Sequence, residues 1–264
     1  MLSLETFELL ALALAPIGFI FTYVYLRDEY EREPLKFLII TFILGVLTAA
    51  PVIYVGDILR EYTGTSSHSA SLFDLFIYAF FVVATTEEGM KYLVLRFYNY
   101  PHKEFDEPYD GIMYGVAVSL GFAAIENVFY VFGPSDDPWS VAIVRMFTAV
   151  PAHATFGIIM GYFVGRAKFL GTDKHPMAER MKGLGLAILL HGMYDFFLFV
   201  DQNRPQLESS STATDSFSQM FLSFGTLIPL GIFAFVSLVI GILFSRRAMK
   251  QHSAISPHKS NDLP

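Results

Sequence analysis

The sequence contains no cysteine among its 264 residues. Disulfides, thiolate metal sites and cysteine nucleophiles are therefore excluded, and any chemistry has to use Glu, Asp, His, Ser, Thr or Lys. Charged residues are also scarce, at 16% of the chain, whereas 53% of the residues are hydrophobic. This composition is typical of a protein with several membrane-spanning helices. The net charge is -7 and the sequence contains no block of basic residues, so we do not expect nucleic acid as a partner. We expect the chain to lie in a lipid bilayer.

The apolar runs are separated by short connections that leave too little sequence for a soluble domain. We therefore expect one transmembrane helical domain over residues 1–250, with a catalytic core at about 72–200 and a disordered cytoplasmic tail at 251–264. Residues 201–216 are rich in polar residues and predict a flexible outer loop. The first apolar run lacks a basic n-region and an A-x-A site, so no cleavable signal peptide is expected.

Seven segments are long and apolar enough to cross about 30 Å of hydrocarbon as α-helices. The predicted fold class is therefore all-α, a polytopic transmembrane helix bundle. The segments lie near residues 6–26, 35–57, 72–98, 111–132, 141–165, 183–200 and 217–244.

Lysine and arginine in the connections predict the orientation of this bundle. The connections after the first, third and fifth segments, together with the C-terminal tail, carry 14 of these residues. The opposite side carries two, Arg60 and Arg204. By the positive-inside rule, the N-terminus is expected outside and the C-terminus in the cytoplasm.

Ionisable residues interrupt four consecutive segments at a similar depth. A charge at the centre of a membrane helix costs about 3 kcal/mol on insertion scales, so such residues usually have a function. Glycines at a spacing of four continue from one of them, at Gly157 and Gly161, and predict close contact between helices. The ionisable residues are Glu87, Glu88 and Lys91 in TTEEGMKYLVLR, then Glu126, His153, and the pair His191 and Asp195.

Each of these residues also has a purely structural interpretation. Glu87 or Glu88 could form an architectural ion pair with Lys91, and adjacent carboxylates point about 100° apart on a helix, so we expect only one to reach a reaction centre. A single histidine such as His153 is more often a packing residue. Arg145 lies nearer the outer boundary, where snorkelling or pairing with a carboxylate is the expected role.

Three functions remain open from the residues alone: hydrolysis by a glutamate-activated water with or without a metal, proton-coupled transport, and a structural role. A zinc site of the His2Glu kind needs three protein ligands and an open position. Glu126, His153 and His191 could supply those ligands, with Asp195 as a fourth ligand or an orienting partner. Glu87 or Glu88 would then be the general base.

The same residues lie in motifs that resemble the PrsW family of intramembrane proteases, which is related to the CAAX prenyl endopeptidases and the bacterial Abi proteins. The resemblance covers roughly residues 80–200, and its E-E-x-x-K, F-x-x-x-E-N and H-x-x-x-D elements occur in the family order. The matching residues are Glu87, Glu88 and Lys91, then Phe122, Glu126 and Asn127, then His153, and finally His191 with Asp195.

This resemblance implies an integral endopeptidase of the plasma (inner) membrane that cuts another membrane protein, with an anti-sigma factor as one candidate substrate. It also implies a divalent metal ion, and the histidine and carboxylate donors indicate zinc. The CAAX enzymes have His and Asn where this chain has Glu126 and Asp195. That difference favours an acidic site able to hold a cation, and it leaves a metal-free glutamate protease as the alternative.

Overall fold

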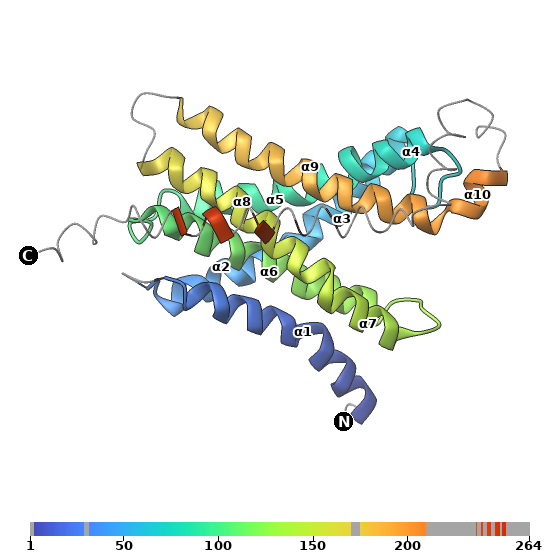
Figure 1. The fold of residues 1–264 in the computed structure, drawn as a ribbon, viewed down its shortest axis with the longest axis horizontal. Coiled ribbons are helices and arrows are strands. Elements are labelled where there is room, and N and C mark those ends of the chain that lie inside the picture. The colour runs from blue at the N-terminus through green and yellow to red at the C-terminus, as the bar shows by residue number, and fades with distance from the viewer. Residues whose placement is uncertain are drawn as a thin grey trace, which may run out of the picture.

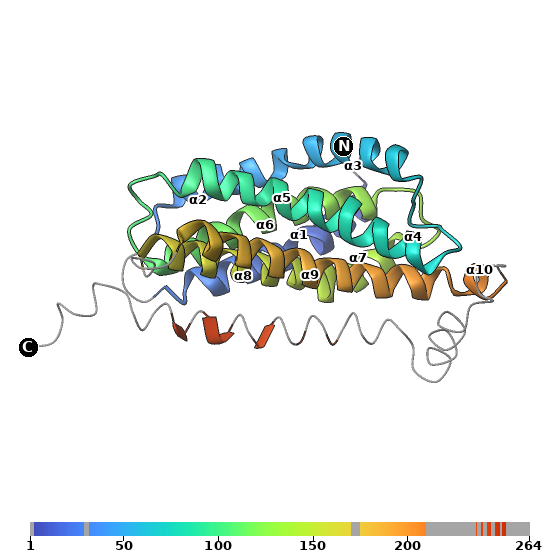
Figure 2. The ribbon, with the colours of Figure 1, turned by 90° about the horizontal axis from the view of Figure 1, so that it is seen from above.

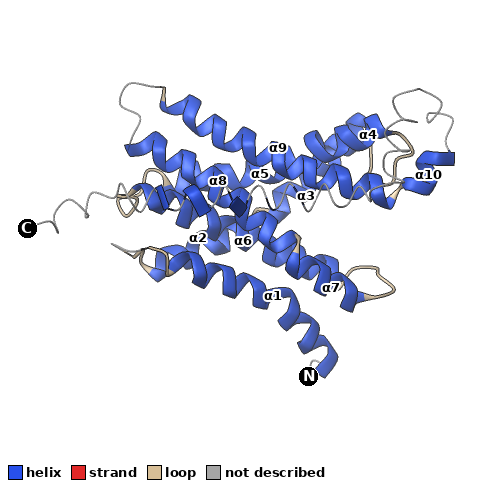
Figure 3. Ribbon diagram, viewed as in Figure 1, coloured by secondary structure: helices blue, strands red, loops and turns tan. Residues whose placement is uncertain are grey.

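The computed structural model describes residues 3–28, 32–169 and 175–209, together with isolated positions between 236 and 251. Within this part of the chain all regular secondary structure is helical, which confirms the all-α class (Figures 1 and 3). The helices run along the long axis of the molecule in both ribbon views (Figures 1 and 2). Their bounds are α1 Leu4–Tyr25, α2 Leu35–Leu47, α3 Ala49–Thr63, α4 Leu72–Ile77, η1 Tyr78–Ala84, α5 Thr85–Val94, η2 Leu95–Asn99, α6 Pro108–Val131, α7 Pro138–Phe147, α8 Ala149–Phe169, α9 Pro176–Gln202 and α10 Arg204–Ser209.

Five helical stretches of the described residues are long and apolar enough to cross a membrane. The predicted segment at 72–98 is also helical, but it is divided into α4, η1, α5 and η2 and carries three intramembrane charges. The predicted segment at 217–244 and the predicted tail at 251–264 lie almost entirely outside the described residues. The five stretches are Leu4–Tyr25, Leu35–Thr63, Pro108–Val131, Pro138–Phe169 and Pro176–Gln202.

Two of these stretches are interrupted three residues before a proline. The helix breaks at Thr48 before Pro51, and again at Thr148 before Pro151. Proline has no N–H to donate to the preceding turn, and its ring clashes with the carbonyl of that turn. The break before Pro151 separates α7 from α8, so the segment expected at 141–165 forms two helices.

The stretch that carries the two adjacent glutamates is partly π-helical. The backbone N–H and the hydroxyl of Thr85 both donate to the carbonyl of Phe80, five residues earlier. A second π-helical segment, η2, follows α5. These wide turns insert residues into the helix and are frequent at functional sites, and the sequence pattern did not predict them.

Helix α6 lies at the centre of the bundle, packed against α8, α2 and α1. Glycines bring its backbone into direct contact with α8: a Cβ at Gly161 would overlap the carbonyl of Gly111, and a Cβ at Gly157 would overlap the carbonyl of Gly115. The close helix contact predicted at Gly157 and Gly161 is therefore confirmed, and the structure identifies α6 as the partner helix. The outer helices α1, α2 and α3 instead leave large apolar side chains exposed, as expected of surfaces that face lipid.

The connections alternate between the two ends of the bundle. In Figures 1 and 2, residues 64–71 and residues 132–137 lie at one end, whereas the connections after α1 and η2 lie at the other. The expected loop at 201–216 is wrong for its first part, because α9 continues to Gln202 and α10 follows. Asn203 fixes this region by donating to the carbonyl of Ser67 at 2.6 Å, and Leu207 is buried.

Candidate active site

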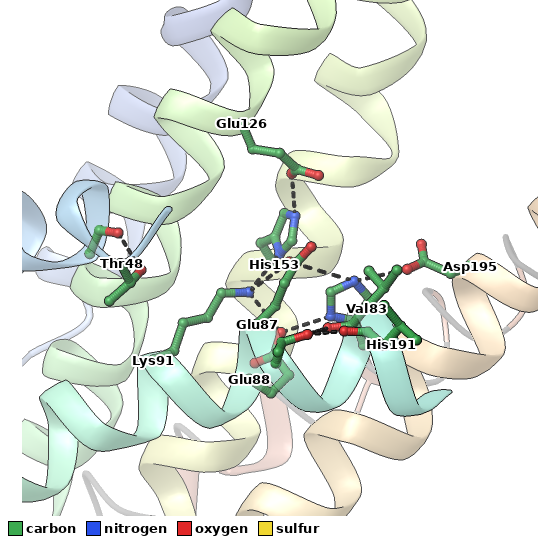
Figure 4. A network of polar contacts seen from close by, with 12 residues as sticks. Thr48, Val83, Glu87, Glu88, Lys91, Glu126, His153, His191 and Asp195 are labelled. Carbon is green, nitrogen blue, oxygen red and sulfur yellow. Dashed lines mark hydrogen bonds and ion pairs between the residues drawn. The ribbon is translucent and has the colours of Figure 1, made fainter. Parts of the chain in front are cut away.

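The seven ionisable residues singled out in the sequence come from four helical elements and form one network (Figure 4). Helix α5 supplies both glutamates and the lysine, α6 supplies Glu126, α8 supplies His153, and α9 supplies His191 and Asp195. The glycine contacts between α6 and α8 fix the spacing of two of these helices. The predicted convergence inside the bundle is therefore present in the structure.

Four of the residues form the compact centre of the network, which we call the Glu–His cluster: Glu87, Glu88, His153 and His191. Each offers one ligand atom, and these atoms all lie within 4.8 Å of one another. All four side chains are buried. The expectation that only one of the adjacent glutamates would reach the centre is wrong, because long glutamate side chains can close the angle between neighbouring helix positions.

Lys91 lies against this cluster and is completely buried. Its Nζ is 2.7 Å from Glu88 Oε1 and 3.6 Å from Glu87 Oε2, so it balances the charge of the glutamate pair. The same Nζ lies 3.1 Å from Nδ1 of His153. The pairing of Lys91 with the glutamates was foreseen as a structural interpretation, whereas its contact with a histidine 62 positions away was not.

The contacts of His153 determine which of its ring nitrogens carries the proton. A lysine ammonium can only donate, so Nδ1 accepts from Lys91. Nε2 must then be the N–H, and it donates to Glu126 Oε2 at 2.7 Å. Glu126 therefore holds the imidazole in the tautomer whose Nδ1 lone pair faces the Glu–His cluster, as carboxylate partners do for metal-binding histidines.

His191 has a similar arrangement. Its Nδ1 lies 2.8 Å from Glu88 Oε1, inside the cluster, and its Nε2 lies 3.3 Å from Asp195 Oδ2. The ring stacks on Phe156, with centroids 5.0 Å apart and an angle of 19° between the planes. Both imidazoles thus direct Nδ1 inward and have an orienting carboxylate at Nε2.

Two further residues complete the network, and for one of them, Arg145, pairing with a carboxylate was among the roles expected from the sequence. Arg145 on α7 donates to Glu126 Oε2 at 2.7 Å and to Asn127 Oδ1 at 2.7 Å. Asn127 in turn donates to the carbonyl of Ala13 on α1 at 3.1 Å. Charge balance could have predicted this contact, because Glu126 and Arg145 have opposite charges and each was expected inside the membrane without a partner on its own helix.

The donor set of the Glu–His cluster fits a metal ion of the zinc type. Two imidazole nitrogens and carboxylate oxygens are typical zinc ligands. One oxygen of each glutamate, Oε2, is buried without a hydrogen bond, so ligand positions remain available. Among the described residues Glu126 and Asp195 do not join this compact set, which differs from the ligand set expected from the sequence. Their contacts instead orient the two imidazoles.

The fold and the network together define a class: a polytopic membrane protein with a glutamate–histidine centre buried among its helices. The sequence matches the family described as PrsW family intramembrane metalloprotease over residues 33–245. The chain therefore belongs to the PrsW family and is an intramembrane endopeptidase. This membership decides between hydrolysis and the alternatives of proton-coupled transport and a structural role.

Several curated relatives have the name Protease PrsW. The relative from Geobacillus kaustophilus (strain HTA426) is 38% identical over 74% of this chain and 82% of its own length. The relative from Bacillus subtilis (strain 168) is 38% identical over 73% of this chain and 83% of its own length. The relative from Clostridioides difficile (strain 630) is 34% identical over 74% and 80%, respectively. No solved structure matches the chain.

Proposed function

We propose that the Glu–His cluster is the centre at which a peptide bond of a membrane-protein substrate is hydrolysed. The observation that supports this assignment is the convergence of two buried carboxylates and two imidazoles from three helices, with a lysine that balances their charge. Burying ionisable groups in a membrane bundle costs free energy, so groups that are buried there usually have a function. The substrate is another membrane protein, and an anti-sigma factor is the candidate that the family resemblance implies.

The residues that would hold a zinc ion are His153 and His191, each through Nδ1, together with Glu88. When bound, zinc supplies Lewis-acid polarisation of the scissile carbonyl and of the attacking water. Glu126 keeps His153 in the tautomer that ligation requires. Asp195 orients His191 through Nε2, and Nδ1 of His191 would give up the proton that it donates to Glu88 when it binds a metal. This assignment differs from the expectation drawn from the sequence for Glu126, which has an orienting role in place of a ligand role, and for Asp195 it takes the orienting alternative.

Glu87 is the general base in this scheme. Its Oε2 accepts no hydrogen bond, and its side chain is 9% exposed, whereas the Glu88 side chain is 0% exposed and accepts from both Lys91 and His191. A carboxylate that is not already hydrogen-bonded can take the proton of the attacking water and then deliver it to the leaving amine. Lys91 prevents the two neighbouring glutamates from carrying uncompensated charge.

A metal-free glutamate protease of the CAAX type is the second candidate, and one contact favours it. The Lys91 ammonium lies 3.1 Å from His153 Nδ1, so it uses the lone pair that a metal ligand would need. In this scheme Glu87 still activates the water, and the N–H donors of Lys91 and His191 stabilise the oxyanion. Metal analysis of the purified protein separates the schemes: bound zinc that is lost in His153→Ala supports the first.

The proposed topology has seven spans with the N-terminus outside and the C-terminus in the cytoplasm, as one domain of the plasma (inner) membrane. It is supported by the basic residues, which concentrate on one set of connections, and by the grouping of the connections after α1 and η2 at one end of the bundle. Fusions of alkaline phosphatase and of a fluorescent protein to each terminus test it, because each reporter is active on only one side of the membrane.

The proposed chemistry is tested with Glu87→Gln in the full-length protein. Membranes that contain the protein and a panel of tagged single-span proteins, anti-sigma factors included, are examined for cleaved fragments by immunoblotting and mass spectrometry. We expect Glu87→Gln to lower cleavage about 1000-fold, because a general base contributes roughly 100-fold to 10,000-fold. Glu61→Gln, a change of the same kind at an exposed position of α3, is the matched control. Cleavage at the wild-type rate by folded Glu87→Gln would contradict the assignment.

A further inference from the structure

Three cationic side chains gather around one aromatic ring at the end of the bundle where η2 and α8 end and α9 begins (Figures 1 and 2). We call them the Tyr100 cations: Arg96, Lys168 and Arg180. The guanidinium carbons of Arg96 and Arg180 lie 5.0 Å and 5.1 Å from the centroid of the Tyr100 ring, and Nζ of Lys168 lies 5.5 Å from it. Three helical elements that are far apart in the sequence therefore place positive charge around a single side chain.

Arg180 is the member of this group that most clearly lacks a negative partner. It is only 9% exposed, and among the described residues it forms no ion pair, because its neighbour Glu179 pairs with Lys182 at 2.6 Å. One terminal nitrogen donates to the Tyr100 hydroxyl at 3.3 Å, and the other lies 3.6 Å from the sulfur of Met177. Its Nε is buried and donates to no described atom. A buried guanidinium without a carboxylate is costly, so this side chain points to an anion from outside the chain.

Arg96 and Lys168 add two more charges that form no ion pair within the described part of the chain. Arg96 is half-buried. The ammonium of Lys168 donates to the backbone carbonyls of Tyr100 and His102 at 2.9 Å and 3.3 Å, and the three carboxylates within its electrostatic range make no ion pair with it. An ammonium carries three hydrogens, so Lys168 can donate to one further acceptor.

The depth of the Tyr100 cations agrees with the level of lipid headgroups. Arg180 precedes His191 by eleven positions on α9, which is about 16 Å along the helix axis. Half of the hydrocarbon core is about 15 Å thick. With the Glu–His cluster in the middle of the membrane, the Tyr100 cations therefore lie at its edge. In the proposed topology this is the cytoplasmic edge, where the leaflet contains anionic lipids.

The surface beside Arg96 is apolar and exposed. Leu93 and Phe97, which precede and follow Arg96 in the same helical stretch, are 44% and 69% exposed. Apolar surface of this kind suits acyl chains, whereas a water-soluble anion would gain nothing from it. A phospholipid fits both features, with its chains against Leu93 and Phe97 and its phosphate against the Tyr100 cations.

We infer that Arg96, Lys168 and Arg180 bind the phosphate of an anionic phospholipid. The planar donors of arginine match the oxygens of a phosphate, and lysine adds a point charge. A zwitterionic lipid has the same phosphate, but its ammonium group brings a further positive charge next to three cations, so its binding is weaker. The bound lipid joins η2 to the facing ends of α8 and α9.

Lipid binding is tested by thermophoresis of the labelled full-length protein in detergent, with phosphatidylglycerol as the anionic probe and phosphatidylcholine as the zwitterionic one. Wild type should bind phosphatidylglycerol about 10-fold more tightly than phosphatidylcholine. Arg96→Gln and Arg180→Gln should each weaken the binding of phosphatidylglycerol about 10-fold, because each removes a hydrogen bond to a charged group. Arg96 is half-buried, and Arg180→Gln keeps an N–H for the Tyr100 hydroxyl, so both variants should fold.

A matched control separates a defined site from general attraction to negative charge. Lys182 lies on α9 near Arg180, and its side chain is 57% exposed. Lys182→Gln removes one positive charge from the same end of the bundle and should leave the affinity for phosphatidylglycerol nearly unchanged. Inorganic phosphate in large excess should not displace the lipid, because it makes no contact with Leu93 and Phe97.

Four outcomes would overturn the inference. Equal affinities for the two lipids would show that the charge of the lipid is not recognised. Equal losses in Lys182→Gln and Arg96→Gln would indicate general attraction. Displacement by inorganic phosphate would identify a site for a soluble anion. Unchanged lipid affinity in Arg96→Gln, together with slower cleavage in phosphatidylcholine vesicles, would mean that the cations contact an acidic segment of the substrate.

Discussion

The two carboxylate clusters of this protein use similar acidic residues in different surroundings. In the Glu–His cluster, a buried lysine and two imidazoles contact the carboxylates directly. In a second group, which we call the oxygen cluster, the carboxylates of Glu33, Asp106 and Asp110 lie close together. Tyr114 contacts Glu33, backbone N–H groups donate to Asp110, and Lys168 bonds to carbonyls. The comparison indicates that the partners, more than the carboxylates, distinguish a site suited to water activation from a group of carboxylates at the start of a helix.

The largest expected difference between the clusters is their response to chelators. 1,10-Phenanthroline, which prefers zinc-type metals, should lower proteolysis at least 100-fold if the imidazoles hold such a metal. EGTA, which prefers Ca²⁺, should leave most of the cleavage rate. Rates measured on a tagged membrane substrate, with zinc added back, check this. Full activity in phenanthroline would favour the metal-free scheme.

Removal of the buried lysine should have the next largest effect. Lys91→Met leaves the Glu88 carboxylate buried without its partner at 2.7 Å, which should destabilise the protein by about 3–5 kcal/mol. The double variant Lys91→Met/Glu88→Gln should recover part of that loss, because the unpaired charge is removed as well. Chemical denaturation in detergent measures both.

The matched control for this prediction is Lys168→Met at the oxygen cluster. Lys168 donates to backbone carbonyls and is not completely buried, so its replacement should cost about 1 kcal/mol. If Lys91→Met and Lys168→Met lowered the free energy of unfolding equally, the distinction between the two clusters would be wrong.

Replacement of Arg145, which contacts Glu126 next to the Glu–His cluster, should have a moderate effect on cleavage and zinc content. Arg145→Gln removes the contact that holds Glu126 against His153, so cleavage and zinc content should both fall about 10-fold to 100-fold. Arg145→Lys keeps the charge and should restore part of both. Unchanged zinc content in Arg145→Gln would show that Glu126 does not depend on this arginine.

The smallest effect is a pH dependence of stability at the oxygen cluster. Glu33 has a pKa raised from 4.5 to about 7, so the folded chain binds the proton more tightly and stability should fall as pH rises from about 4.5 to about 7. The groups that face Glu33 are Tyr114 and Asp110 from α6 and Asp106 and Asp28 from the connections. Melting temperatures across this range should be flatter for Glu33→Gln than for wild type.

The sequence was sufficient to predict the helical class and the residues that meet in the Glu–His cluster. Apolar length identified the helices, and charges in apolar runs are rare enough to mark a site by themselves. The glycine spacing at Gly157 and Gly161 also predicted a close helix contact, because a stripe of small residues lets two helix backbones approach each other closely, but it did not identify α6 as the partner.

Other features depend on contacts that no local pattern encodes. The position of Arg145 beside Glu126 requires knowledge of how α7 turns after α6. The inward direction of Nδ1 in both histidines, which leaves Glu126 and Asp195 in contact with Nε2 of the two rings, depends on side-chain rotation. The oxygen cluster joins residues from connections, where charged side chains are ordinarily solvated and give no signal.

The glycine contacts between α6 and α8 also restrict how a substrate reaches the scissile position. No room exists there for a single methyl group, so an unwound polypeptide cannot be threaded between these two helices. A substrate therefore has to reach the Glu–His cluster without passing between α6 and α8, and among the carboxylates of the network Glu126 and Asp195 are the most exposed, at 18% and 14% of their side chains.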